Sequence, residues 1–153
     1  MTVPASPEEV AAASAQAMWA GDQASRSLGM ELLDVTPGRA TVRMTVREDM
    51  VNGHAIGHGG FTFTLADSAF AFACNSRNEA TVASGLTVDF LAPVKRGDML
   101  TADAVEVART GRTGVYDIVV TNRAGARVAL VRGRSARLGD RTVLPVTAAE
   151  ETR

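Results

Sequence analysis

The hydrophobic residues of this chain change their spacing several times, and each spacing predicts a different element. Residues 39–46 alternate between hydrophobic and polar positions, which is the pattern of a half-buried strand. Residues 30–35 predict a second strand, joined to the first through Thr36-Pro37-Gly38, a typical hairpin turn. Four more strands are predicted where Val, Thr, Leu and Ala dominate between turn sequences, at residues 81–91, 99–108, 114–121 and 127–137.

Two segments have helical patterns instead. Ser6-Pro7-Glu8-Glu9 can form a capping box with proline in the first turn, and the alanine-rich stretch after it predicts a helix to about Gly21. Residues 61–74 are too long and too rich in alanine for a strand, and their apolar positions surround a helix without forming a stripe. Such a helix is expected to be buried on most sides. Residues 52–60, with four glycines, predict a loop before it.

These elements predict a single α+β domain over residues 1–153, with a polar and loose tail at 140–153. About six strands with short connections give a mostly antiparallel sheet. A helix that is apolar all round is best covered by a curved sheet wrapped around it. One such sheet leaves an edge strand open, so we expect a dimer or a larger oligomer.

The composition narrows the function classes. Lys and Arg number 16 against 17 Asp and Glu, so there is no electrostatic reason to expect a nucleic acid or an anionic membrane as partner. The one cysteine, Cys74, excludes an intramolecular disulfide and a multi-cysteine metal site, and its apolar surroundings predict a buried thiol. No segment has the form of a signal peptide or of a membrane helix, so we expect a soluble, cytoplasmic protein.

Asp67 is the candidate for chemistry within the predicted buried helix. Phe63 and Phe70 flank it at helical spacing, and in apolar surroundings the pKa of an aspartate rises. A carboxylate in that condition can serve as a base or a nucleophile. It can also be structural, capping a break or pairing with an arginine, and the residue alone does not decide between these roles.

The glycine-rich loop favours the chemical role. Gly59 and Gly60 lie where the first N–H groups of the helix lack partners, and such groups can hold a developing oxyanion. A carboxylate further along the same helix adds the second part that acyl transfer requires. Asn52 and His58 either act on the substrate or order the loop, and ordering the loop is the preferred interpretation of His54. Because these histidines lack supporting ligand spacing, we expect no metal site.

The chain also resembles a known family. The segments that carry the resemblance are NGHAIGHGG at residues 52–60, LADSAFAFACNS at 65–76, DFLAP at 89–93, Gly97-Asp98, TGVYD at 113–117 and RGRS at 132–135. They closely resemble the phenylacetic-acid-degradation thioesterases of the hot-dog superfamily, over most of the chain from about residue 11 to 139. The loop alone marks the superfamily, while the helix and the TGVYD segment narrow the match.

The resemblance implies a hot-dog fold and a set of roles. Asp67 would act as nucleophile or as general base, the Gly59 N–H would polarise the thioester carbonyl, and Asn52 and His58 would position the thioester or the attacking water. It also implies a site at the interface of a homodimer, with dimers paired into a homotetramer. No metal and no redox cofactor is implied, because coenzyme A enters as part of the substrate.

Several alternatives stay open at this point. The resemblance implies phenylacetyl-CoA or hydroxyphenylacetyl-CoA as substrate, with other aromatic or medium-chain acyl-CoAs as the alternative. A hydratase or dehydratase that pairs His58 with Asp67, and a non-catalytic acyl-CoA-binding regulator, are rival functions. Candidates to meet the CoA phosphates are Lys95, Arg96, Arg112, Arg132 and Arg134, each of which can equally be an ordinary surface charge. Candidates to line an aryl pocket, or simply the core, are Phe61, Phe63, Phe70 and Phe72.

Overall fold

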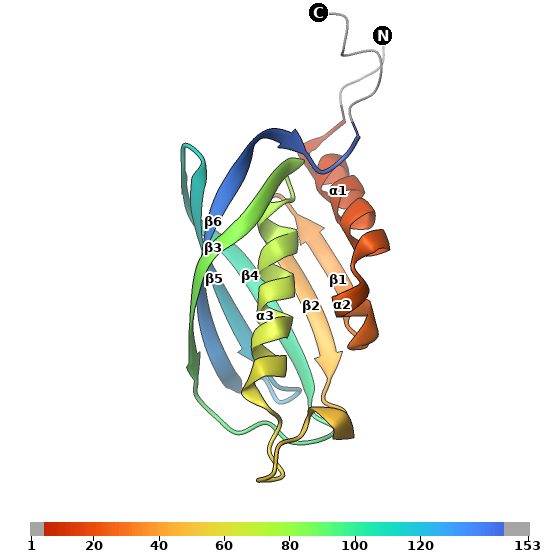
Figure 1. The fold of residues 1–153 in the computed structure, drawn as a ribbon, viewed down its shortest axis with the longest axis vertical. Coiled ribbons are helices and arrows are strands. Elements are labelled where there is room, and N and C mark those ends of the chain that lie inside the picture. Colours follow the sequence, from red (N-terminus) through yellow and green to blue (C-terminus); the bar gives the residue numbers. More distant parts are fainter. Residues whose placement is uncertain (1–4, 146–153) are drawn as a thin grey trace, which may run out of the picture.

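A curved antiparallel sheet of six strands wraps around one long helix (Figure 1). The computed structural model describes residues 5–145. In chain order the strands are β1 (Glu31–Thr36), β2 (Arg39–Thr45), β3 (Glu79–Phe90), β4 (Met99–Thr110), β5 (Thr113–Thr121) and β6 (Arg127–Thr142). Their order across the sheet is β1-β2-β4-β5-β6-β3, and every neighbouring pair is antiparallel. The expected α+β, hot-dog architecture is confirmed.

The N-terminal helix α1 (Pro7–Gly21) begins as the sequence predicts. The Ser6 hydroxyl accepts the Glu9 N–H, and the Glu9 carboxylate accepts the Ser6 N–H, which completes the capping box. A short helix α2 (Gln23–Ser27), which was not predicted, follows directly. Figure 1 shows both beside the central helix, on the β1 side of the sheet.

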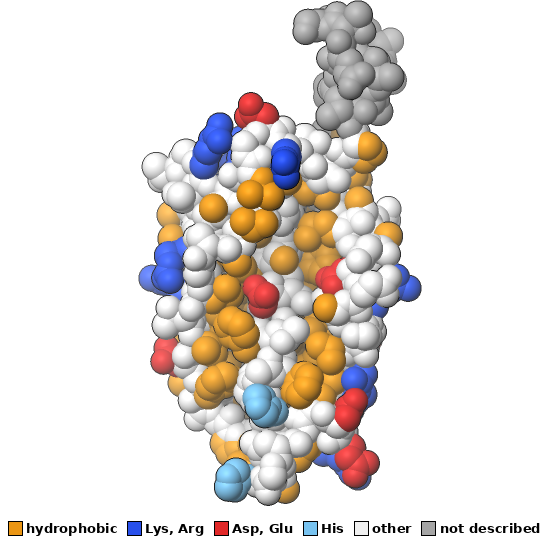
Figure 2. All heavy atoms as spheres, viewed as in Figure 1, with side chains coloured by type: hydrophobic (Ala, Val, Ile, Leu, Met, Phe, Trp, Pro, Cys, Tyr) orange, Lys and Arg blue, Asp and Glu red, His pale blue; other side chains and the backbone are white. Residues whose placement is uncertain are grey.

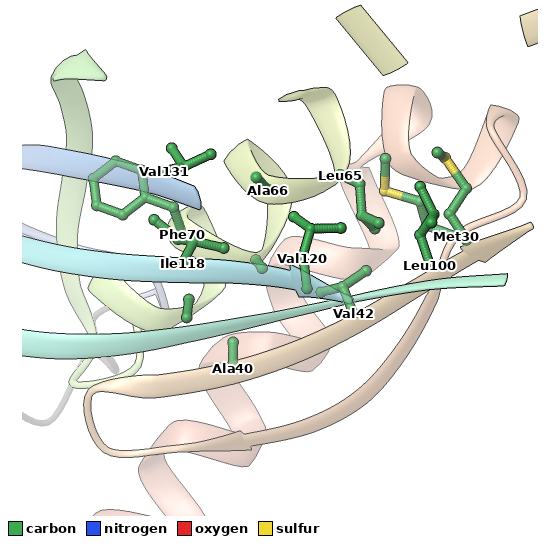
Figure 3. Packing of buried hydrophobic residues seen from close by; sticks show 14 of the residues in the cluster. Met30, Ala40, Val42, Leu65, Ala66, Phe70, Leu100, Ile118, Val120 and Val131 are labelled. Atoms are coloured by element: carbon green, nitrogen blue, oxygen red, sulfur yellow. The ribbon is translucent and has the colours of Figure 1, made fainter. Parts of the chain in front are cut away.

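The central helix α3 (Gly59–Cys74) lies across the concave face of the sheet. Its start was placed two residues too late, at residue 61, because glycines have low helix propensity and histidine is an unusual cap. Leu65, Ala66 and Phe70 of α3 point toward the sheet residues that they contact in the core (Figure 3). Phe70 packs directly against Gly133 of β6, where an added Cβ would lie 2.9 Å from the Phe70 ring.

The helix is less enclosed than its composition predicts. Phe63, Thr64, Asp67, Ser68 and Ala71 are all only partly buried. Figure 2 shows this open side, with hydrophobic side chains along both flanks of α3 and acidic groups between them. The prediction of a helix buried on most sides is therefore wrong for this face of the single chain.

Hydrogen bonds fix the C-terminal end of α3 against the sheet. The buried Asn75 side chain donates to the carbonyls of Ala71 and Thr81 and accepts the Thr81 N–H, each at 2.9 Å. Nearby, the Arg77 guanidinium pairs with the Glu106 carboxylate at 2.6 Å. Because these contacts fix the end of the helix, they also limit its rotation and sliding over the sheet.

The C-terminal strand runs further than expected. β6 extends to Thr142, where it pairs with Glu79 at the start of β3, so the first residues of the predicted tail at 140–153 are a strand. Residues 146–153 of that tail lie outside the described part of the chain.

A short 3-10 helix at Glu48–Met50 was also not predicted. No helix within residues 5–145 is long and apolar enough to span a membrane.

Candidate active site

The loop before α3 is built around the Asn52 side chain. Its Oδ1 atom accepts the N–H groups of His54 at 2.9 Å and of Ile56 at 3.2 Å. The Gly57 N–H donates to the Val94 carbonyl at 2.6 Å, which ties the loop to the connection between β3 and β4. Asn52 therefore shapes the loop through its carbonyl oxygen, and His54 contributes its backbone while its side chain is exposed.

His58 is the N-cap of α3. Its Nδ1 atom accepts the Gly60 N–H at 2.9 Å, so the neutral ring carries its proton on Nε2. Its own N–H donates to the Met50 carbonyl at 2.7 Å, and its ring packs edge-on against Phe61. The imidazole thus fixes the first turn of the helix.

The Gly59 N–H is an unused donor at the positive end of a 16-residue helix. No acceptor for it occurs within residues 5–145, whereas the neighbouring N–H groups of His58 and Gly60 both have one. On its side-chain face, Gly59 contacts the ring of Phe90, because a Cβ placed there would lie 2.8 Å from Phe90 Cζ. This donor is free to bind an oxyanion or a polarised carbonyl oxygen.

Asp67 lies midway along α3 on its open side, and it is half-buried. Burial raises the pKa of its carboxyl above the usual range, and no charged or hydrogen-bonding group of residues 5–145 offsets this. Within the described residues, Asp67 therefore neither caps a break in the helix nor pairs with an arginine. A partly desolvated carboxylate without a partner remains available as a base or nucleophile.

Gly59 and Asp67 cannot meet one reacting atom within a single chain. They are eight residues apart on one α-helix, which separates them by about 12 Å along the axis at 1.5 Å per residue. A reacting carbonyl must lie about 3 Å from the donor and about 3 Å from a directly attacking carboxylate, or one water molecule further from a carboxylate that acts as general base. A separation of about 12 Å along one helix exceeds both. His58 is one residue further away, so a His58–Asp67 pair of the hydratase type does not form within the chain either.

The basic candidates are scattered over the molecule. Arg132 is held by the Asp117 carboxylate through two hydrogen bonds of 2.7 and 2.8 Å, and Arg96 lies 3.4 Å from Glu48. Lys95, Arg112 and Arg134 form no ion pair within the described residues. A role of any of the five toward phosphate stays a prediction.

Of the other candidates, Cys74 is buried as expected, and burial raises the pKa of its thiol to about 12. The residues described hold no group of His, Cys, Asp or Glu that could bind a metal. Phe70 and Phe72 belong to the core, while Phe61 and Phe63 pack against its edge. The aromatic residue that sequence reasoning missed is Phe90, which is 55% exposed and touches Gly59.

Sequence comparisons relate the chain to thioesterases. Residues 54–129 match the family model described as the thioesterase superfamily. The acyl-coenzyme A thioesterase PaaI of Escherichia coli is 48% identical over 125 residues, which is 82% of this chain and 89% of that protein.

Solved structures agree with the sequence relatives. The Escherichia coli PaaI protein from the phenylacetic acid degradation operon superposes with a TM-score of 0.87 at 46% identity, covering 89% of this chain and 99% of that one. A variant of the phenylacetic acid degradation protein PaaI from Thermus thermophilus gives 0.74 at 40% identity, covering 76% and 100%. A Streptococcus mutans protein bound to acetyl CoA gives 0.71 at 26% identity, covering 74% and 91%.

Proposed function

The chain belongs to the thioesterase superfamily, and from that membership we propose that it hydrolyses aryl-acetyl-CoA thioesters to the free acid and CoA. Phenylacetyl-CoA and hydroxyphenylacetyl-CoA are the proposed substrates. The similarity to PaaI supports this substrate class, since that relative comes from a phenylacetic acid degradation operon. The observation that carries the chemistry is a pair of groups on α3 that have no partner within residues 5–145, the Gly59 N–H and the Asp67 carboxylate.

In the proposed reaction, the thioester carbonyl oxygen accepts the Gly59 N–H, which draws electron density from the carbonyl carbon. With Asp67 as general base, the carboxylate takes a proton from water as the water oxygen attacks that carbon. The Gly59 donor stabilises the resulting oxyanion. Collapse then breaks the carbon–sulfur bond, and the CoA sulfur leaves with the proton held by Asp67. Direct attack by the carboxylate, with later hydrolysis of the anhydride, uses the same two groups.

The distance between these groups supports a site that a second copy of the chain completes. β3 is an edge of the sheet, with Val82, Ala83 and Ser84 exposed along it. Two-fold pairing of this edge with a second β3 would set the two α3 helices antiparallel and side by side. The N-terminus of one helix would then approach Asp67 of the other. We propose that a homodimer completes two equivalent sites, and that dimers pair into tetramers.

His58 and Asn52 support this site in the proposed mechanism. His58 fixes the first turn of α3 through Nδ1, and its Nε2 atom forms no hydrogen bond within the described residues, which leaves it available to the substrate or the attacking water. Asn52 holds the loop in shape through Oδ1, while its amide NH2 donates no hydrogen bond within the described residues.

The substrate class is tested by kcat/KM measurements on a panel of thioesters, with released CoA detected by a thiol reagent. We expect phenylacetyl-CoA and hydroxyphenylacetyl-CoA to exceed benzoyl-CoA and straight-chain acyl-CoAs, because kcat/KM reports discrimination in the transition state. Consumption of an enoyl-CoA without CoA release would instead show a hydratase. Tight binding of every thioester without turnover would show a regulator.

The pH dependence follows from the burial of Asp67. Because only the deprotonated carboxylate can act, kcat/KM should fall on acidification, with a midpoint above the ordinary aspartate pKa of about 3.9. The profile is measured with phenylacetyl-CoA over the range in which the protein stays folded, checked by circular dichroism. A limb at or below the ordinary value would contradict a desolvated Asp67 as the reacting group.

A further inference from the structure

A pocket of about 300 Å³ opens beside Gly59, between the loop before α3 and the connection that follows β3. Ile56 lines it from the loop, and Phe90, Leu91 and Val94 line it from the connection. Its buried lining includes Val128 of β6 and Thr62 of α3. Among the described residues, no charged side chain lines it.

Exposed hydrophobic side chains gather at this pocket. Phe90 is 55% exposed, Leu91 52% and Ile56 36%, although the three come from two segments far apart in the sequence. Clustered exposed hydrophobic groups mark binding surfaces more often than isolated ones do. An apolar ligand would remove all three from water at once.

Hydrogen bonds hold the walls of the pocket in place without a ligand. The Gly57 N–H binds the Val94 carbonyl at 2.6 Å, and the Leu91 N–H binds the Val128 carbonyl at 2.9 Å. Asn52 fixes the backbone of Ile56 through its side-chain oxygen. The pocket is therefore formed in advance, as small-molecule sites usually are.

The pocket adjoins the position proposed for the thioester carbonyl. Phe90 lines it and also touches Gly59, whose N–H is the free donor. A group attached to a carbonyl at that donor would therefore enter the pocket directly. The size fits an aromatic ring and a methylene group, because a cavity of about 150 Å³ already binds benzene.

We infer that this pocket is the subsite for the acyl group and that Phe90 is a specificity-determining residue, an assignment that rests on the proposed thioester hydrolysis. The CoA arm is the other part of the substrate that meets the carbonyl carbon. It carries two amide groups, and burying these in a pocket whose side chains are almost all hydrocarbon would leave them without partners. A hydrocarbon acyl group incurs no such cost.

The test compares phenylacetyl-CoA with acetyl-CoA, which share the CoA arm and differ in the group assigned to the pocket. We expect Phe90→Ala to lower kcat/KM for phenylacetyl-CoA about tenfold relative to acetyl-CoA. Filling the pocket with Ile56→Phe should likewise disfavour phenylacetyl-CoA while acetyl-CoA turnover persists. Val107→Ala, which removes a side chain of similar exposure outside the pocket, should leave the ratio unchanged.

The outcomes separate this inference from the proposed function. If Phe90→Ala and Ile56→Phe lower kcat/KM equally for both substrates, the pocket holds the CoA arm and the inference is overturned. If neither variant changes kcat/KM for phenylacetyl-CoA or for acetyl-CoA, the pocket binds no part of the substrate and the inference is likewise overturned. The proposed function, in contrast, is overturned by the wild-type protein itself, if it hydrolyses no thioester or prefers straight-chain acyl-CoAs to the aryl-acetyl-CoAs. Light scattering on each variant confirms that the oligomeric state is unchanged, since Phe90 ends the edge strand β3.

Discussion

Replacing Asp67 with asparagine should lower kcat on the order of 10²- to 10⁴-fold while leaving the fold intact. Asparagine has nearly the same shape, but it cannot accept a proton or attack a carbonyl carbon at neutral pH. No ion pair or hydrogen bond within residues 5–145 is lost, because burial is the only influence on the Asp67 carboxyl there. The measurement is single-turnover hydrolysis of phenylacetyl-CoA, with Asp34→Asn, an exposed aspartate on β1, as control.

The free energy of unfolding should not fall in the Asp67→Asn variant, although its kcat does. The Asp67 carboxyl has a higher pKa in the folded than in the unfolded chain. At a pH below the unfolded pKa it is neutral in both states and does not destabilise the fold. As the pH rises from the unfolded to the folded pKa, the cost of burying its charge grows and then stays constant. Asp67→Asn should therefore be at least as stable as the wild type at pH 7 in denaturant unfolding. A marked loss of stability, or hydrolysis at the wild-type rate, would show that Asp67 is structural.

Gly59→Pro should lower kcat on the order of 10²- to 10³-fold, because it deletes the single backbone donor proposed to hold the oxyanion. Position 59 is the first residue of α3, where proline is well tolerated since its N–H is not needed by the helix. His58 has φ −62° and ψ 127°, an extended conformation compatible with a following proline. The helix should therefore form as before.

Gly59→Ala is the matched control for this variant. Both substitutions place a Cβ about where the Phe90 ring now lies, so both push that exposed ring aside. Only proline removes the N–H. A much larger loss of kcat for proline than for alanine identifies the donor as the cause. Equal losses would assign the effect to the displaced Phe90 ring.

How far the sequence predicts this molecule depends on how local each feature is. The capping box at Ser6, the hairpin at Gly38 and the desolvated Asp67 follow from neighbours along the chain, and each is confirmed. The extension of β6 to Thr142 depends instead on pairing with Glu79, 63 residues earlier. No local pattern marks such pairing.

The candidate site also has parts that the local sequence predicts and parts that depend on distant contacts. Residues 52–76 contain both the free donor at Gly59 and the carboxylate at Asp67. That both lie on the same helix, too far apart to share a substrate, is known only once the helix is seen to begin at Gly59. The contact between Phe90 and Gly59 depends on where β3 ends relative to the loop, and β3 contains irregular pairing at Ala83/Gly85. A bulge of this kind shifts the register, so the sequence could not place that ring.

Asp67 of one chain is proposed to act with Gly59 of another, and mixed assemblies test this pairing directly. Asp67→Asn and Gly59→Pro chains with different tags are co-expressed, and assemblies that contain both are purified through the two tags in succession. In each mixed dimer, one site has both substituted residues and the other has neither. We predict recovery of up to about half of the wild-type kcat per dimer, because a two-fold interface forms two equivalent sites. Mixed assemblies as inactive as the two parents would contradict a shared site.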